Sequence, residues 1–138
     1  MLLPKKVKYR KWHTMRRNVS RIGVATRGAT LAFGSFGLKA TTDARILSNQ
    51  IEAARKVLSR AMGKSGKIWI RIFPDMPITR KPAEVKLGKG KGDLHAYVAP
   101  VLPGRIIFEI DGVAEAIAKE ALRKAGTKLP IKSKVVAR

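Results

Sequence analysis

The sequence predicts a single α+β domain in which two helices pack on an antiparallel sheet, with a basic N-terminal arm and a long Gly/Lys hairpin loop. Three observations lead to this fold class. Two segments repeat apolar residues at helical spacing, several short apolar segments are separated by Gly and Pro turns, and all nine acidic residues lie at or after Asp43. A chain of 138 residues suits one hydrophobic core, and it has no cysteine for a disulfide or a thiolate metal site.

Residues 1–28 are expected to form the basic arm, and residues 29–138 the folded body. The first 42 residues carry ten Lys or Arg and no acid, and the net charge of +21 makes nucleic acid the expected partner. Tyr9 and Trp12 lie between cations, where flat side chains can stack on bases. A solvated, disordered charge run is the alternative interpretation. The candidate RNA-binding residues of the arm are Lys5, Lys6, Lys8, Tyr9, Arg10, Lys11, Trp12, Arg16, Arg17, Arg21 and Arg27.

The first half of the body is expected to contain a short strand at residues 30–33, a helix at 48–63 and a strand at 67–73. Apolar residues recur every three to four positions in the helix, which Ser48 or Asn49 would cap and Gly63 would end. Its apolar face favours core packing over a membrane-surface role. The strand alternates strictly, and its second face carries Trp69 and Arg71. These two side chains could contact RNA, or Trp69 could belong to a second buried layer.

The second half of the body reads as several strands followed by a helix and a tail. Prolines at 74, 77 and 82 predict an extended, non-helical path on which Arg80 and Lys81 are exposed. Strands are expected at residues 84–87, 94–102 and 105–110, with a turn at Pro103-Gly104. A helix ending at Gly126 should carry four-residue Glu-to-Lys pairs, and residues 128–136 can add a last strand.

Residues 86–93 read Lys-Leu-Gly-Lys-Gly-Lys-Gly-Asp and form the predicted Gly/Lys loop. Glycine permits positive φ and close backbone approach, so the lysines between the glycines can face an anionic partner. The stretch is not a nucleotide-binding fingerprint, because Gly92 follows Lys91 where a P-loop requires Ser or Thr. His13 and His95 are isolated, and the carboxylates show no catalytic pairing. The sequence therefore predicts no enzyme, cofactor, metal site or small-molecule substrate.

Two other classes of basic protein fit the sequence less well than an RNA-embedded one. A free-standing nucleic-acid-binding protein should show a recognition helix with exposed Arg, Asn or Gln, or a dimer interface, and neither predicted helix has such a face. A membrane-active protein needs a strongly basic amphipathic helix, whereas the arm lacks apolar periodicity. No apolar run reaches the roughly 18 residues of a membrane span.

Several sequence blocks resemble the bacterial-type large-subunit ribosomal protein uL16 family. They are Met-Leu-Leu-Pro-Lys-Lys at the start, Phe-Gly-Ser-Phe-Gly-Leu-Lys-Ala at 33–40, Gln-Ile-Glu-Ala-Ala-Arg at 50–55, Gly-Lys-Ile-Trp-Ile-Arg-Ile-Phe-Pro-Asp at 66–75, Gly-Lys-Gly-Lys-Gly at 88–92 and Lys-Leu-Pro-Ile-Lys at 128–132. The resemblance runs end to end. Family members begin at the same block, so the basic start is expected to belong to the mature protein and not to a transit peptide.

The resemblance implies a structural protein of the large ribosomal subunit, in the cytoplasm or in an organelle, that joins late in assembly. It implies contacts with large-subunit rRNA, neighbouring ribosomal proteins, A-site tRNA and, as a further candidate, P-site tRNA near the peptidyl-transferase centre. The arm residues would contact rRNA, together with body residues Arg55, Lys67, Arg71, Arg80 and Lys81. The residues nearest tRNA would be Lys86, Gly88, Lys89, Gly90, Lys91 and Gly92.

The chain departs from the family pattern at two places. Residues 16–30 are poorer in glycine than is usual, which leaves the contacts of that segment open. Lys86 stands where bacterial members commonly carry an arginine that some of them hydroxylate. A lysine cannot carry that modification, and it offers a point charge in place of a planar bidentate fork.

Overall fold

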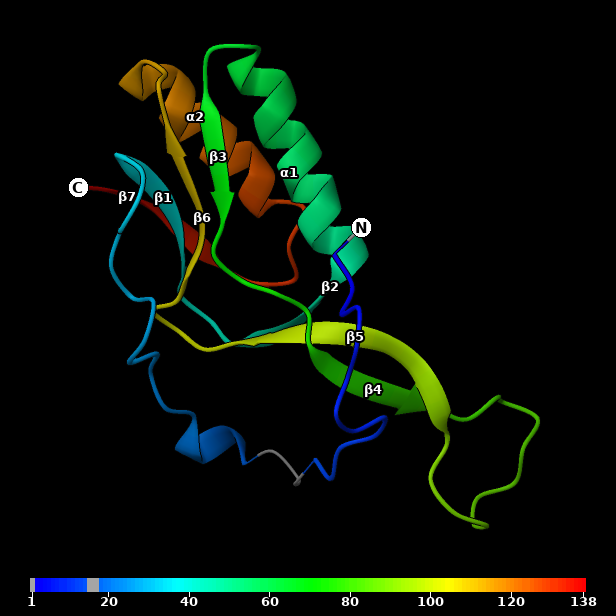
Figure 1. Cartoon of the computed structure of the whole chain (residues 1–138). Coiled ribbons are helices and arrows are strands. Elements are labelled where there is room, and N and C mark those ends of the chain that lie inside the picture. Colours follow the sequence, from blue (N-terminus) through cyan, green and yellow to red (C-terminus); the bar gives the residue numbers. More distant parts are fainter. Residues whose placement is uncertain (1, 15–17) are drawn as a thin grey trace.

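The computed structural model describes residues 2–14 and 18–138, which form two antiparallel sheets and two helices (Figure 1). The first sheet has the strand order β3-β6-β1-β7 and the second has the order β2-β5-β4. The helices and strands are β1 Phe36–Ala40, β2 Ala44–Leu47, α1 Ser48–Met62, β3 Lys67–Ile70, β4 Met76–Arg80, β5 Asp93–Val101, β6 Ile106–Asp111, α2 Glu115–Gly126 and β7 Ser133–Ala137, preceded by the 3-10 turn η1 Val19–Arg21. The α+β prediction is confirmed, with two sheets where one was expected.

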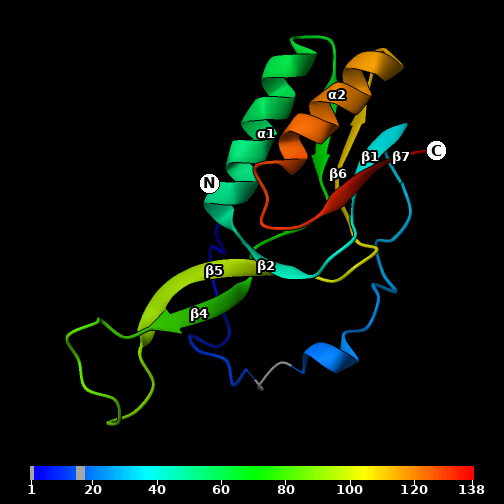
Figure 2. The same ribbon diagram turned by 180° about the vertical axis from the view of Figure 1, so that it is seen from behind.

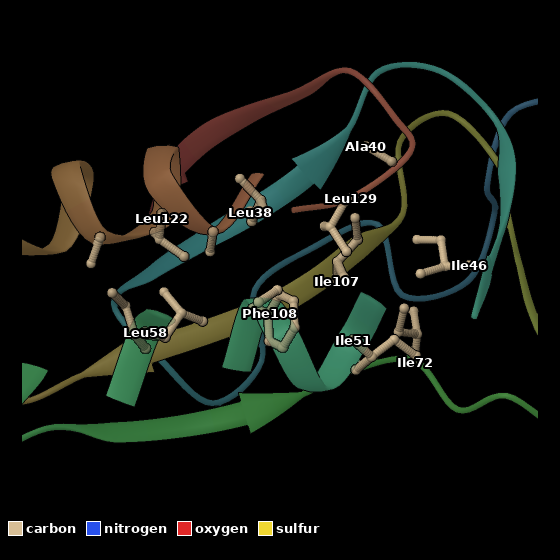
Figure 3. Close-up of a cluster of buried hydrophobic side chains, with 14 of the residues drawn as sticks. Leu38, Ala40, Ile46, Ile51, Leu58, Ile72, Ile107, Phe108, Leu122 and Leu129 are labelled. Carbon is tan, nitrogen blue, oxygen red and sulfur yellow. The ribbon is translucent and has the colours of Figure 1, made fainter. Parts of the chain in front are cut away.

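Helices α1 and α2 lie side by side on one face of the four-stranded sheet, as the two opposite views show (Figures 1 and 2). The core forms between them: Phe108 of β6, Leu58 of α1 and Leu122 of α2 are fully buried and meet in one cluster (Figure 3). The apolar stripes predicted for both helices are confirmed at their centres. Ile117 is an exception, because it lies at helical spacing from the buried residues of α2 but is 47% exposed.

The three-stranded sheet extends away from this core as a curved hairpin of β4 and β5 (Figure 1). Its inner end is buried through Ile46 of β2 and Val98 and Val101 of β5. Its outer end pairs Arg80 with Asp93, and beyond that pair the chain leaves the sheet. The hairpin therefore carries its loop well outside the hydrophobic core. No helix in the described part of the chain combines the length and apolar character needed to cross a membrane.

Most predicted elements are confirmed with small shifts of their ends. The first helix spans 48–62 and ends at Gly63, which has a φ of 63°. The strand predicted at 67–73 is hydrogen-bonded as β3 over 67–70, and Arg71 N still donates to Ile107 O at 2.8 Å. The strands near 94–102 and 105–110, the turn at Pro103-Gly104, the second helix and the C-terminal strand are all present.

Two predicted strands are wrong, and three strands, β1, β2 and β4, were not predicted. Residues 30–33 form no strand, because the backbone there turns its N–H groups toward a side chain of β6; the strand begins at Phe36. Residues 84–87 lie in a loop, in which Val85 N donates to Pro82 O at 3.2 Å. The strand before the loop is instead β4, which contains Pro77. A proline is compatible with β4 because β4 is an edge strand.

The predicted N-cap of α1 is also wrong. Ser48 is already helical, and the cap is Leu47, whose backbone is extended at φ −75° and ψ 154°. The backbone N of Leu47 donates to the side-chain oxygen Oε1 of Gln50 at 2.9 Å. The glutamine at the third helical position thus supplies half of a capping box without a Ser or Asn at the cap.

Candidate nucleic-acid interface

The β4–β5 loop, residues 81–92, is the most exposed part of the body. It is longer than the Gly/Lys loop predicted at 86–93, since it begins after Arg80, and Asp93 already belongs to β5. Every residue from 82 to 91 is exposed, and Leu87 retains 95% of its surface. The tip of this loop makes almost no contact with the body, so its side chains are available to a partner.

Three consecutive residues at the tip have positive φ: Gly88 at 107°, Lys89 at 53° and Gly90 at 89°. A Cβ added at Gly88 or Gly90 would meet nothing within 4 Å, so these glycines are required by backbone conformation and not by lack of space. Gly92 differs, because its Cβ would lie 2.9 Å from the backbone of Arg80 at the base of the hairpin. The glycines therefore set the path of the loop, as the sequence predicted.

The basic arm reaches the base of this loop. Lys91 Nζ donates to the carbonyl oxygen of Trp12, and Lys11 Nζ lies 3.5 Å from Asp93 Oδ1. Lys81 Nζ donates to the carbonyl oxygen of Gly88 across the loop itself. We call the Lys91–Trp12 and Lys11–Asp93 contacts the arm–loop clasp. The clasp joins two basic segments about 80 positions apart in the sequence into one surface.

Most of the arm cations are exposed to solvent. Lys5, Lys6, Lys8, Arg10, Arg21 and Arg27 are all exposed, and Tyr9 and Trp12 retain 61% and 39% of their surfaces. The Lys8 ammonium lies 5.4 Å from the centroid of the Tyr9 ring. Arg16 and Arg17 lie outside the described residues. Leu2 packs against the hydrophobic core, which ties the start of the arm to the body.

The body cations predicted to contact rRNA fall into two groups. Arg80, Lys67 and Lys81 are exposed or half-buried, and Arg80 and Lys81 lie where the hairpin opens into the loop. Arg55 and Arg71 already have acidic partners within the protein. Arg55 forms two hydrogen bonds with Glu52, at 2.9 Å and 2.7 Å. Lys86 and Lys89 have no hydrogen bond or ion pair with any described residue, which leaves both ammonium groups open to an anion.

The ion pair of Arg71 is built around Glu109, whose side chain is completely buried on β6. Its carboxylate accepts hydrogen bonds from the backbone N of Ala32 at 3.1 Å, of Phe33 at 2.6 Å and of Gly34 at 2.8 Å, and from the Arg71 guanidinium. Burial alone would raise the pKa of Glu109, but these four donors outweigh it and lower the pKa below its ordinary value. Glu109 thus stays ionised and holds the 32–34 turn on the sheet.

Trp69 is neither free nor part of a second buried layer. It is half-buried, and its ring stacks on the ring of Phe33, with centroids 6.1 Å apart and an interplanar angle of 16°. Phe33 itself remains 57% exposed. Phe108 faces the helices, so its neighbour Glu109 faces the opposite side of the sheet. Trp69 is paired with Glu109 across the sheet, so the aromatic pair lies on the face opposite the helices.

Glu109 and Phe33 were not among the residues that the sequence singled out. One signal was present: Glu109 is the single acid in an otherwise apolar run, Ile106-Ile107-Phe108-Glu109-Ile110, and a buried acid needs a partner. Its partners could not be identified, because they lie 75 to 77 positions earlier in the chain and 38 positions earlier at Arg71.

Comparison with known proteins supports the resemblance over the full chain. Residues 4–136 match the sequence model of the family described as ribosomal protein L16p/L10e. Among the similar proteins is the large ribosomal subunit protein uL16 of Rhodopseudomonas palustris strain BisB18, which is 58% identical over all 138 residues and 98% of its own length. The proteins of the same name from Nitrobacter winogradskyi and Afipia carboxidovorans are each 56% identical over the same shares of both chains. Together with an α+β body that presents a basic arm and loop, these matches show that the chain belongs to the ribosomal protein L16p/L10e family.

Proposed function

We propose that this protein is a structural component of the large ribosomal subunit that binds large-subunit rRNA and neighbouring ribosomal proteins. Its β4–β5 loop lies toward A-site tRNA, with P-site tRNA as a second neighbour, and the protein joins the subunit late in assembly. The basic arm and the body cations Lys67, Arg80 and Lys81 bind rRNA phosphates. The role is architectural, in keeping with a family of ribosomal proteins and not of enzymes.

The observation that carries this proposal is the arm–loop clasp. A net charge of +21 alone would attract any polyanion. The clasp joins residues 11–12 of the arm to the base of the loop, at the open end of the β4–β5 hairpin (Figure 1). An arm bound to rRNA phosphates would hold the base of the loop while Lys86 and Lys89 stay free for a second nucleic acid. An arm bound to rRNA and a loop free to contact a second nucleic acid fit a protein that lies between rRNA and tRNA.

The loop part of the proposal is tested by Lys86→Ala with Lys89→Ala in reconstituted large subunits. Both lysines lack intramolecular partners among the described residues, so the fold should not change, whereas A-site tRNA binding should weaken. The matched control is Lys56→Ala with Lys64→Ala, which removes the same charge from two exposed positions on α1 and just after it, far from the loop (Figure 1). Equal tRNA affinity in the loop variant and the control would refute a role of the loop at tRNA.

The rRNA part is tested by the salt dependence of binding. Each neutralised phosphate of a duplex should contribute about 0.9 to the slope of log affinity against log salt. We expect a steep slope for the free protein and a smaller one after removal of the charges at Lys5, Lys6 and Lys8. A flat slope would contradict electrostatic rRNA binding. Salt-resistant co-sedimentation with large subunits, but not with bulk RNA or DNA, separates a ribosomal protein from a free-standing nucleic-acid-binding protein.

A further inference from the structure

The Phe33 ring is an exposed aromatic surface on the sheet face that the helices leave open. It retains 57% of its surface while one side rests against Trp69. Figure 1 shows the segment before β1 passing along the edge of this sheet face, with the helices behind the sheet. Phe33 belongs to neither the arm nor the β4–β5 loop, so the interface described above leaves it without a role.

The turn that carries Phe33 is fixed on both sides. Its own backbone N and that of Gly34 are bound by the buried Glu109 carboxylate at 2.6 Å and 2.8 Å. Ser35 donates its hydroxyl hydrogen to Asp111 Oδ1 at 2.8 Å and accepts at its carbonyl from the backbone N of Arg138 at 3.0 Å. The backbone on both sides of the ring is therefore held to the body by hydrogen bonds.

Two cations border the ring pair. The Lys67 ammonium lies 5.3 Å from the Trp69 ring centroid, and the Arg71 guanidinium carbon lies 5.1 Å from the Phe33 ring centroid. Lys67 and Trp69 alternate along β3, and Arg71 follows just past its end with its backbone N still bonded to Ile107 O, so all three side chains rise from the same sheet face. Arg71 and Trp69 both contact the Phe33 ring, whereas Lys67 contacts Trp69, and Phe33 still retains 57% of its surface for a partner.

We propose that Phe33 is a stacking platform for an unpaired base of large-subunit rRNA, with exposed Lys67 neutralising an adjacent phosphate. A fixed aromatic ring with a basic rim matches an unstacked nucleotide, which presents a flat π-face beside a negative charge. Base faces inside a duplex are covered by their neighbours, so the platform selects a loop, bulge or single strand. The inference rests on the proposed function, because it assigns a new contact within rRNA binding.

Varying the salt concentration separates the contribution of stacking to affinity from the contribution of charge. Stacking on Phe33 should be nearly independent of salt, whereas each phosphate contact contributes about 0.7 to the salt slope for a single strand. The full chain is titrated with a single-stranded oligoribonucleotide and with a duplex of the same length over a range of salt. Affinity is then extrapolated to 1 M salt, where the electrostatic part vanishes. The variants are Phe33→Leu, which keeps an apolar side chain, Phe33→Tyr, which keeps the ring, and Lys67→Ala.

Phe33→Leu should lower the single-strand affinity at 1 M salt by about 5- to 150-fold, the range measured for one base–aromatic stack, with an unchanged slope. Phe33→Tyr should bind as the parent protein does, and duplex affinity should not change in either variant. Lys67→Ala should lower the slope. An unchanged intercept for Phe33→Leu, or an equal loss for the duplex, would overturn the proposal. A flat slope for the parent protein would instead refute the proposed electrostatic binding, so the two failures are distinguishable.

A second measurement uses the assembled subunit. Replacing Phe33 with a photoreactive phenylalanine analogue and irradiating reconstituted large subunits should give a crosslink to rRNA at an unpaired nucleotide. A crosslink to a ribosomal protein would show that the platform binds a protein partner and would overturn the assignment to RNA. The matched control position is Phe73, which is also exposed, at 46%, but makes no ring stack or cation contact with any residue that the structure describes.

Discussion

Replacing Glu109 with Gln should destabilise the protein far more than the neutralisation of any exposed acid. The side chain is completely buried, and it joins three parts of the fold: β6, the 32–34 turn and Arg71 at the end of β3. Gln has the same shape but no charge. Its amide nitrogen is a donor, and it would face groups that are themselves donors.

The size of the effect follows from burial. Removing one partner of a buried ion pair costs about 3–5 kcal/mol, because the remaining charge is left uncompensated. The side chain of Arg71 is still 18% exposed, so water can relieve part of this penalty and the lower end applies. We expect Glu109→Gln to lower the free energy of unfolding by about 3 kcal/mol, a large part of the roughly 5–15 kcal/mol typical of a native domain.

The assay is urea unfolding followed by circular dichroism at neutral pH. The control is Glu115→Gln, which removes an exposed acid paired with Lys119 on α2 and should leave the midpoint unchanged. Adding Arg71→Met to the Glu109→Gln variant should destabilise it less than Arg71→Met destabilises the parent protein. A loss below about 1 kcal/mol for Glu109→Gln, with an unchanged m-value, would refute the view that this carboxylate anchors the turn.

The same carboxylate predicts a pH dependence. Its pKa is lowered in the folded protein, so the unfolded chain binds the proton more tightly. The contribution of Glu109 to stability is therefore complete above its unfolded pKa of about 4.3, and it is lost as the pH falls through the folded value. The difference in unfolding free energy between the parent protein and Glu109→Gln should shrink as the pH is lowered below about 4.3. A constant difference would contradict the lowered pKa.

Two further variants test the turn and the clasp. Gly34→Ala should destabilise the protein by about 1–3 kcal/mol in thermal unfolding, because its Cβ would lie 2.6 Å from the carbonyl oxygen of Ile110. Gly23→Ala is the control and should be tolerated, because its Cβ would meet nothing within 4 Å. Equal midpoints would contradict this close approach. Lys91→Ala removes a clasp contact and should speed amide hydrogen exchange in residues 82–92 without changing the unfolding midpoint. Lys89→Ala is the control and should leave the exchange rates unchanged. Identical exchange rates in the two variants would show that the clasp does not order the loop.

The sequence correctly predicted the helices and strands that are determined by their own residues. Helix α1 was found because Ile51, Ala54 and Leu58 repeat with the helical period, and these side chains are buried as expected. Strand β4 was missed because Pro77 argues locally against a strand. Only the sheet order shows that β4 is an edge, where proline is tolerated. The predicted bounds of the loop were wrong for the same reason, because Arg80 of the missed strand β4 pairs with Asp93 of β5.

The turn at Phe33 shows a different limit of sequence reasoning. Residues 30–33 have the composition of a strand, and only a carboxylate more than 70 positions away makes them turn. Neither composition nor periodicity encodes that contact. The Phe-Gly-Ser-Phe-Gly block was identified through the family resemblance, but the sequence alone assigned Gly34 no structural role. Gly34 is required by the close approach of the β6 backbone, a tertiary constraint.

The direction of the electrostatic field depends on where the acids lie and not on the total of +21. On α2, Glu115 and Glu120 lie 2.5 Å and 2.6 Å from the ammonium groups of Lys119 and Lys124, so the exposed face of that helix carries charges of both signs. The basic arm has no acid, and neither do residues 86–92 of the loop. The clasp joins these two acid-free basic segments into one surface, and that surface attracts a polyanion. The same 30 cations and nine acids in shuffled positions would keep the net charge and lose this direction.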